Sequence, residues 1–335
     1  MYHPSVSVDV HAHWKQFLEQ HGFEIRDTLG VERAFGRVPS AASMDSTATR
    51  CVDLNHFDAM QLVGPDASTF LQGYLTCDTA SLDQTHALFG AYCNIKGRVV
   101  ADATVLLTHE HPTLLVHASL RATIATSLGK YLAFSRSRFT PPDAAPLLLG
   151  IVNPAPDPAL PSEPLTVTQL RGGYAIAMPG LQPRVLLVLP AAAAAALWLE
   201  YAAQSATADA TIWDLLDIRA GIAHVCAATS ETFLPQMLDY DQLGGVSFTK
   251  GCYLGQEIVA RTQHRGRPKR HLHSLRWSGA PTPAIGAPLL RGDGSHAGTL
   301  VATAAVATDA GEALAVLNDA GTGTLHADGA TFTAQ

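Results

Sequence analysis

Residues 233–261 read FLPQMLDYDQLGGVSFTKGCYLGQEIVAR, the stretch of the chain with the densest set of chemical groups. The glycine pair at 244–245 permits a tight turn, because glycine adopts backbone angles that other residues avoid. A short strand is expected over 246–248. A helix is expected to open at Gly255 and to run to Arg261. A turn, a strand, a loop and a helix are therefore predicted in close succession.

Lys250 and Cys252 are the candidate reactive pair within this stretch. In an extended segment, residues two positions apart place their side chains on the same face. A thiol near a helix N-terminus and beside a lysine is in surroundings that favour the thiolate. Gly251 and Gly255 leave room for a ligand to approach backbone N–H groups, which can hold an anion. The residues alone also allow Cys252 to be a small buried side chain.

The segment after this helix is locally basic. No Asp or Glu stands between Glu257 and Asp293, and six basic residues fall within residues 261–276, at Arg261, Arg265, Arg267, Lys269, Arg270 and Arg276. The chain as a whole has a net charge of −7, so it is not an electrostatic nucleic-acid binder overall. The basic stretch predicts either a local site for an anion or an RNA backbone, or a solvated surface.

Composition indicates a globular protein of a reducing compartment. The 335 residues are 47% apolar and 15% charged, which gives ample core for two or three packed units. The five cysteines are an odd number without a Cys-x-x-Cys pair, so we predict no disulfide framework and a cytoplasmic location. Three His-x-His pairs lack nearby completing ligands, and no metal site is predicted. The longest apolar run, 185–199, falls short of the roughly 20 residues of a membrane span.

The order of strand-like and helix-like runs predicts an α+β fold with antiparallel sheets. Strands are expected at 88–93, 98–107, 113–117, 147–152, 174–178 and 185–189, and helices at 11–21, 119–134, 191–203 and 211–220. Short strands and glycine-rich turns after residue 268 predict a small β-barrel. The predicted units are an N-terminal extension and linker (1–48), an α+β region (49–267, divided into 49–145 and 146–267) and the C-terminal barrel domain (268–335).

The stretch 233–261 closely resembles the motif of YgfZ-type folate-binding proteins, relatives of the glycine-cleavage T-protein, an aminomethyltransferase. Weaker similarity extends over roughly 50–335 and includes Gly64-Pro-Asp-Ala67 and Asn94-Ile-Lys-Gly-Arg98. The resemblance implies a ring of three domains around a central channel that binds tetrahydrofolate. It also implies support for synthesis or repair of iron–sulfur clusters in certain enzymes, including a radical enzyme that methylthiolates tRNA.

The resemblance also implies which residues form the site. Cys252 matches the functionally important thiol of the Lys-Gly-Cys-Tyr-x-Gly-Gln-Glu motif, and Lys250 is expected to act with it. Contacts to folate are expected from Asn94, Lys96, Asp102, Arg219, Gly251, Tyr253, Gly255, Gln256, Glu257 and Arg261. The basic stretch would then suit the polyglutamate tail of a folate. The expected partners are folate and iron–sulfur enzymes, and no membrane.

Two departures from the T-protein pattern weaken the reading as an aminomethyltransferase. T-proteins carry an acidic pair after the glycine-rich hairpin, whereas 100–102 reads Val-Ala-Asp here, with Asp102 alone. The T-protein glutamate that holds the pterin is replaced by Arg219, and arginine has only hydrogen-bond donors. An aminomethyltransferase-like one-carbon transferase and an RNA-docking module remain the two alternatives to a folate-binding accessory protein.

Overall fold

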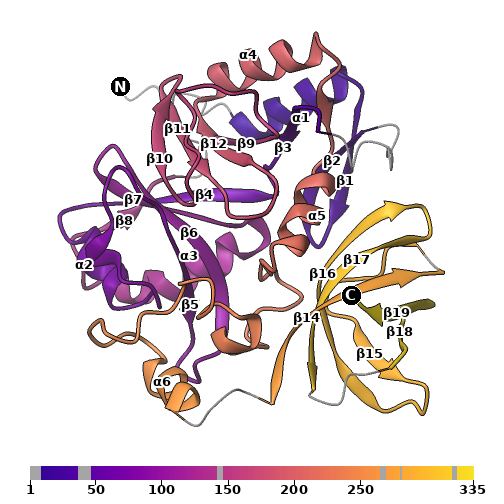
Figure 1. Cartoon of the computed structure of the whole chain (residues 1–335). Helices are drawn as coiled ribbons and strands as arrows, with labels where there is room; N and C mark the ends of the chain where they lie inside the picture. Colours follow the sequence, from indigo (N-terminus) through magenta and orange to yellow (C-terminus); the bar gives the residue numbers. More distant parts are fainter. Residues whose placement is uncertain (1–8, 37–46, 142–145, 265–268, 280, 319–322) are drawn as a thin grey trace.

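Two β-sheets and a β-barrel lie side by side, with helix α5 between the upper sheet and the barrel (Figure 1). The computed structural model describes residues 9–36, 47–141, 146–264, 269–279, 281–318 and 323–335. The predicted α+β class, with antiparallel sheets, helices and a small C-terminal barrel, is confirmed.

The lower sheet has five strands in the order β5-β6-β7-β4-β8, all antiparallel to their neighbours. Its strands are β4 (Phe57–Val63), β5 (Leu88–Cys93), β6 (Val99–Thr108), β7 (His111–His117) and β8 (Arg138–Phe139), with helices α2 (Ala67–Gln72) and α3 (Arg121–Leu132). Side chains of a strand alternate between its two faces. Val105 and Leu106 of β6 accordingly belong to two different core clusters. Both faces of this sheet are therefore buried.

The upper sheet has six strands in the order β10-β11-β12-β9-β3-β13. Its strands are β3 (Arg50–Asp53), β9 (Leu147–Val152), β10 (Val167–Leu170), β11 (Gly173–Ala177), β12 (Arg184–Leu189) and β13 (Thr207–Ala208). One face packs under helix α4 (Ala191–Ala202), and the other packs against the lower sheet and Trp213 of α5 (Thr211–Arg219). Burial on both faces explains why β9 and residues 185–189 of β12 read as unbroken apolar runs.

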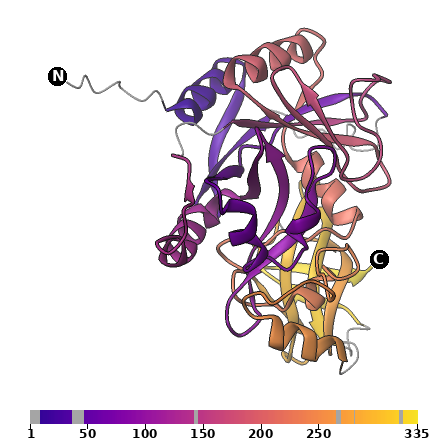
Figure 2. The ribbon, with the colours of Figure 1, turned by 90° about the vertical axis from the view of Figure 1, so that its left-hand side faces the viewer.

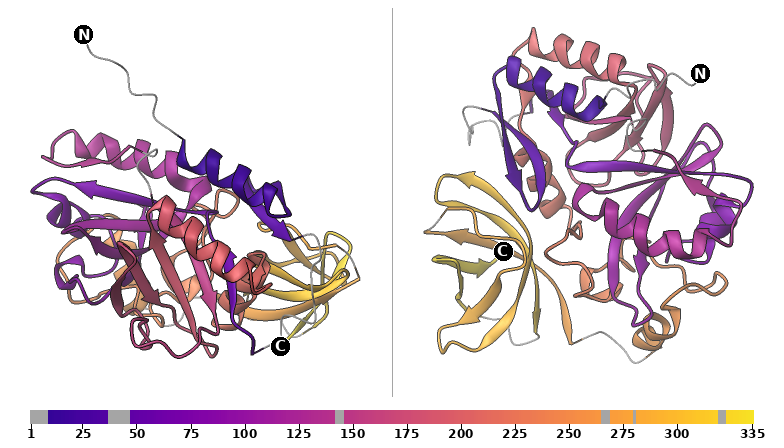
Figure 3. Two further views of the ribbon diagram at one scale, coloured as in Figure 1. Left: turned by 90° about the horizontal axis from the view of Figure 1, so that it is seen from above. Right: turned by 180° about the vertical axis from the view of Figure 1, so that it is seen from behind.

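The N-terminal segment is an ordered layer of this upper unit. Helix α1 (Val10–Gln20) is followed by an antiparallel hairpin, β1 (Phe23–Thr28) and β2 (Val31–Gly36). Figure 2 and Figure 3 show α1 lying beside α4. Trp14 and Leu18 are buried there, and the Trp14 Nε1–H donates to Asp53 over 2.9 Å. The segment predicted as an N-terminal extension is thus folded from α1 onward, and the helix expected at 11–21 is found at Val10–Gln20. Residues 37–46, where the predicted linker falls, lie outside the described residues.

The C-terminal part is a closed six-stranded barrel in the order β14-β17-β16-β15-β18-β19. Its strands are β14 (Arg270–Ser278), β15 (Pro288–Arg291), β16 (His296–Ala307), β17 (Ala310–Asn318), β18 (Leu325–Ala327) and β19 (Ala330–Ala334). Trp277 and Phe332 fill its interior. Val301 and Leu314 on its outer wall join the core that contains Leu215 of α5. The barrel is thus packed onto the helix and not merely tethered to it.

The domain bounds at 48, 145 and 267 stay predictions, although the topology groups β3 with the upper sheet, beyond residue 145. In the part of the chain that is described, no helix is both long and apolar enough to cross a bilayer.

Candidate functional site

The loop that carries Cys252 is fastened to the segment that follows α2. The expected strand over 246–248 does not form, because this segment makes single bonds and not a ladder. The Thr76 hydroxyl donates to the carbonyl of Gly245 over 2.5 Å, and the Ser247 amide donates to the Thr76 carbonyl over 2.9 Å. The Leu254 amide donates to the Gly73 carbonyl over 3.0 Å. The loop between these contacts is held at both ends.

Lys250 is the internal anchor of this loop. Its Nζ donates to the carbonyl oxygens of Leu75 (2.9 Å) and Cys77 (2.6 Å) and lies 5.3 Å from the ring centroid of Tyr253. Only 8% of Lys250 is exposed, and this burial lowers the pKa of its ammonium group. Two carbonyl dipoles and the face of the Tyr253 ring therefore stabilise the buried ammonium charge.

Cys252, in contrast to the buried Lys250, is exposed to solvent. All five cysteines are in the described part of the chain; Cys252 is exposed, and the other four are buried. The expectation that Lys250 and Cys252 share one face is wrong, because the segment between them is an irregular loop in which the lysine turns inward. Exposure also excludes the alternative that Cys252 is a small core residue.

Two glycines let helix α6 (Gln256–His264) pack against the β5–β6 turn. Gly255 has φ +83°, and a Cβ there would lie 2.5 Å from the carbonyl oxygen of Asn94. Gly97 has φ +68°, and a Cβ there would lie 3.0 Å from Cβ of Ile258. Both positions are used by packing, whereas a Cβ at Gly251 would meet nothing within 4 Å. Of the two motif glycines, Gly251 is the one that leaves open space.

Asn94 shapes the β5–β6 turn with its own side chain. Its Oδ1 accepts from the amides of Lys96 (2.9 Å) and Arg98 (3.1 Å), and its Nδ2 donates to Glu231 (3.0 Å). Lys96 itself is exposed at the tip of the turn. The structure thus brings the Asn94–Arg98 segment and the 250–257 motif together, as one surface.

The outward face of α6 carries a local ion pair. Arg261 Nη2 lies 2.7 Å from Glu257 Oε1, one helical turn away, and both side chains are largely exposed. Gln256 is half-buried at the helix start. Farther along the basic stretch, Lys269 is exposed and Arg270 donates to Asn318 over 2.8 Å. Arg265 and Arg267 lie outside the described residues.

Asp102 is engaged on both carboxylate oxygens. One accepts from the Val225 amide over 2.6 Å, and the other lies 2.6 Å from Nδ1 of His224. The residue is 3% exposed. Asp102 is therefore part of a buried network rather than a group presented to a ligand.

His224 sits between two carboxylates in this network. Its Nε2 is 3.6 Å from Asp217, which in turn lies 2.7 Å from the fully buried guanidinium of Arg184. Burial alone lowers the pKa of His224, but the charges and hydrogen bonds of Asp102 and Asp217 outweigh it and raise that pKa to about 10. The imidazole is hence a cation at neutral pH.

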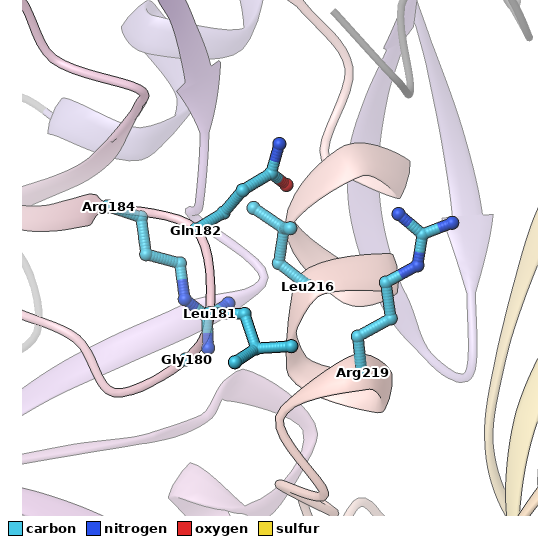
Figure 4. A pocket seen from close by; sticks show the side chains of 6 residues that line it. All are labelled: Gly180, Leu181, Gln182, Arg184, Leu216 and Arg219. Carbon is cyan, nitrogen blue, oxygen red and sulfur yellow. The ribbon is translucent and has the colours of Figure 1, made fainter. Parts of the chain in front are cut away.

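Arg219 links helix α5 to the barrel. Its Nη2 lies 2.7 Å from Oε1 of Glu312 on β17, and Nε lies 3.1 Å from both carboxylate oxygens. Its side chain also lines a pocket of about 160 Å³ between α5 and the loop before β12 (Figure 4). The residue at the position of the T-protein glutamate thus lies at a pocket and carries the opposite charge.

The sequence reasoning missed the network around His224. Arg184 and His224 stand among apolar residues, Asp217 lies between Asp214 and Arg219 on α5, and no motif spacing joins the three. A charged residue within an otherwise buried helix such as α5 was the available signal, because buried charges are paired. In the described part of the chain, no three His, Cys, Asp or Glu side chains gather as a metal site requires.

Two largely antiparallel sheets and a terminal barrel packed on a central helix define the class of T-protein-like folds. The glycine cleavage system aminomethyltransferase T from Bartonella henselae superposes with a TM-score of 0.76 over 96% of this chain and 95% of that one, at 15% identity. That likeness concerns the fold. No protein-family model matches the chain.

Sequence relatives give the family. The tRNA-modifying protein YgfZ of Sodalis glossinidius is 34% identical over 244 residues, which is 70% of this chain and 74% of the relative. The proteins of the same name from Colwellia psychrerythraea and Yersinia pseudotuberculosis are each 32% identical, over 74% and 80% of their lengths. The chain belongs to the YgfZ family. The resemblance drawn from residues 233–261 is thereby confirmed.

Proposed function

We propose that this chain is a cytoplasmic, tetrahydrofolate-binding accessory protein that supports synthesis or repair of iron–sulfur clusters in client enzymes, among them a tRNA-methylthiolating radical enzyme. The observation that carries the proposal is the exposed thiol of Cys252 on a loop fastened at both ends. A thiol presented on a fixed loop is suited to contact a cluster or a client protein. The family's name, tRNA-modifying protein, agrees with a client that acts on tRNA.

The folate part of the proposal requires a binding mode different from that of the T-protein. A pterin offers amino and ring N–H donors, which a carboxylate accepts well. Arg219 does not fit that role, and Asp102 has both oxygens occupied. We therefore assign no residue to the pterin edge. The motif surface formed by Gly251, Cys252 and the Asn94–Arg98 turn is the proposed folate-facing side.

Complementation tests the role of the thiol. Cells that lack the native gene receive wild type, Cys252→Ala or Cys51→Ala, and the activity of a client iron–sulfur enzyme is measured. We expect Cys252→Ala to fail and Cys51→Ala, which removes a buried thiol, to restore activity at equal protein level. Full rescue by Cys252→Ala would refute the role of the thiol.

Folate-dependent aminomethyl transfer is the second candidate, favoured by the T-protein-like fold. It would require Asp102 to act alone, although that residue is buried and bound to His224. Release of methylenetetrahydrofolate from an aminomethylated lipoyl carrier would establish it. Repeated absence of turnover with an active carrier would remove it.

RNA docking through the basic stretch is the third candidate, favoured by exposed Lys269 and Arg270 and by the family's name. Electrostatic binding of tRNA would weaken steeply as salt rises. A tRNA affinity that is undetectable, or the same at low and high salt, would dismiss it.

A further inference from the structure

The end of helix α3 and the strand that follows it expose aromatic rings and cations together. Phe134 is 93% exposed and Tyr131 is 40% exposed. Lys130 and Arg138 of the same segment are exposed as well. The right panel of Figure 3 shows α3 on the outer side of the lower sheet. These four residues are called the α3 surface below.

The rings of this surface continue a row that begins on α2. The ring centroids of Phe70 and Tyr74 are 4.6 Å apart in a stacked pair, and those of Tyr74 and Tyr131 are 5.0 Å apart. Phe70 and Tyr74 are partly buried, whereas Tyr131 ends the row in solvent and Phe134 follows three residues later. A contiguous group of exposed aromatic side chains marks an interaction site more often than single exposed ones do.

The charge around these rings is positive. Residues 111–142 contain no Asp or Glu, although the net charge of the chain is −7. Asp66, which reaches this segment from the start of α2, is paired with Arg136 over 2.7 Å. In the described part of the chain, neither Lys130 nor Arg138 has a carboxylate within ion-pair distance. The two cations therefore remain available to an anionic partner.

We propose that the α3 surface binds unpaired bases of a single-stranded RNA. Tyr131 and Phe134 supply ring faces on which bases stack, and Lys130 and Arg138 contact the flanking phosphates. Stacking on aromatic rings beside cations is how proteins hold single strands without reading their sequence. An acidic protein segment would pair with the cations, but planar bases are the better match for the end of a row of stacked rings.

The inference goes beyond the proposed function and does not depend on folate binding. It also differs from docking through the basic stretch 261–276, where the cations are not interleaved with exposed rings. The ring row adjoins the segment that anchors the thiol loop, because the Gly73 carbonyl accepts from the Leu254 amide and the Leu75 carbonyl accepts from Lys250. RNA at the end of the row would lie beside that segment.

The first test measures the affinity of the full-length protein for a short unstructured RNA strand, for its duplex with the complement and for an abasic strand of equal length. Wild type should bind the single strand more tightly than the other two. Phe134→Ala should lower that affinity about fivefold or more, because one stacked base is lost. Phe134→Trp, which keeps a ring, should bind like wild type or better. Leu199→Ala removes an exposed apolar side chain of α4 and is the matched control.

A second pair of variants tests the phosphate contacts and does not alter any ring. Lys130→Ala should lower the affinity at low salt and reduce the slope of log affinity against log salt by about 0.7. Lys269→Ala, which changes an exposed lysine of the basic stretch, should leave both unchanged. This pair also covers the case in which a Phe134 variant does not fold.

Several results would overturn the inference. One is that wild type does not bind the single strand, or that Phe134→Ala and Lys130→Ala bind it like wild type. Equal affinity for the duplex and the abasic strand would show that base faces play no part. A loss in Lys269→Ala without one in Lys130→Ala would move the RNA to the basic stretch. An acidic client protein that needs Phe134, with no binding of RNA, would assign the surface to protein.

Folate binding is a separate readout on the same variants. Phe134→Ala should bind tetrahydrofolate like wild type, because the α3 surface is not part of the proposed folate-facing side. RNA binding that behaves as expected while wild type binds no tetrahydrofolate would support this inference and refute the folate proposal. Tetrahydrofolate binding without RNA binding would do the reverse.

Discussion

Lys250 and Cys252 stand two positions apart and lie in opposite environments, one among main-chain carbonyls and the other in solvent. The lysine acts on the thiol by fixing the loop that presents it, so it is a positioning residue. His224 likewise depends on its surroundings, because the carboxylates of Asp102 and Asp217 stabilise its imidazolium form in the interior. No sequence motif predicts this arrangement. The roles of Lys250 and His224 therefore follow from the groups that they contact and not from their residue types alone.

Replacing Lys250 with alanine should loosen the loop around Cys252. The carbonyl oxygens of Leu75 and Cys77 lose their hydrogen-bond donor. We expect this loss to lower the free energy of unfolding by about 2–4 kcal/mol. Hydrogen exchange of the Ser247 and Leu254 amides should accelerate, because both bonds depend on the loop's position. Lys269→Ala, which alters an exposed lysine, is the control. Unchanged exchange in Lys250→Ala would contradict the positioning role.

The charge of His224 should make the protein less stable as pH rises. Its pKa is about 10 when folded and near 6.5 when unfolded, so the folded state binds the extra proton. The stabilisation is fully present below about pH 6.5 and is lost as pH rises through about 10. Its size is on the order of 3–5 kcal/mol. Urea unfolding at pH 7 and pH 10 measures it.

Asp102→Asn tests the origin of that dependence. Removing one of the two carboxylates should lower the pKa of His224, which an NMR titration of its ring follows. The difference in stability between pH 7 and pH 10 should shrink with it. An unaltered difference would mean that the pH dependence comes from another group.

At the scale of elements, α6 and the β5–β6 turn depend on each other through glycine. Gly255 has no room for a side chain against the Asn94 carbonyl, and Gly97 has little against Ile258. The helix, which carries the exposed Glu257–Arg261 pair, lies against the turn at these two glycines, where the two backbones approach closely. Part of the 250–257 motif, Gly255 above all, therefore serves the packing of α6 against the turn.

Gly255→Ala should therefore destabilise the protein far more than Gly251→Ala. The first introduces a contact of 2.5 Å at a φ of +83°, while the second meets nothing within 4 Å. We expect a loss of about 3 kcal/mol or more for Gly255→Ala and about 0.5 kcal/mol or less for Gly251→Ala. Denaturant unfolding compares them, and equal losses would show that the helix does not rely on this contact.

At the scale of the whole molecule, the two sheets, the barrel and the N-terminal hairpin surround helix α5. The two sheets bury Trp213, the barrel packs on Leu215, and the N-terminal hairpin places Arg33 within 2.6 Å of Asp214. The Arg219–Glu312 pair fastens the helix to the barrel. The pocket at Arg219 forms where this helix meets the loop before β12.

The N-terminal segment should be necessary for stability, because α1 is packed into the core of the upper unit. Trp14 is 4% exposed, packs against Trp198 and donates to Asp53. Trp14→Ala should lower the unfolding free energy by about 3–5 kcal/mol. His11→Ala, on the half-buried edge of the same helix, should change it little. Comparable melting of both variants and wild type would show that α1 is dispensable.

The sequence by itself determined the family, the α+β class, the terminal barrel and the candidate thiol, because strand and helix periodicity and a long motif are local properties. It also located Asp102 and Arg219 as departures from the T-protein. Only the tertiary structure decided that Lys250 points inward, that Gly255 serves packing, and that Arg219 meets Glu312. Those facts depend on contacts between residues 93 to 175 positions apart, which no local pattern encodes.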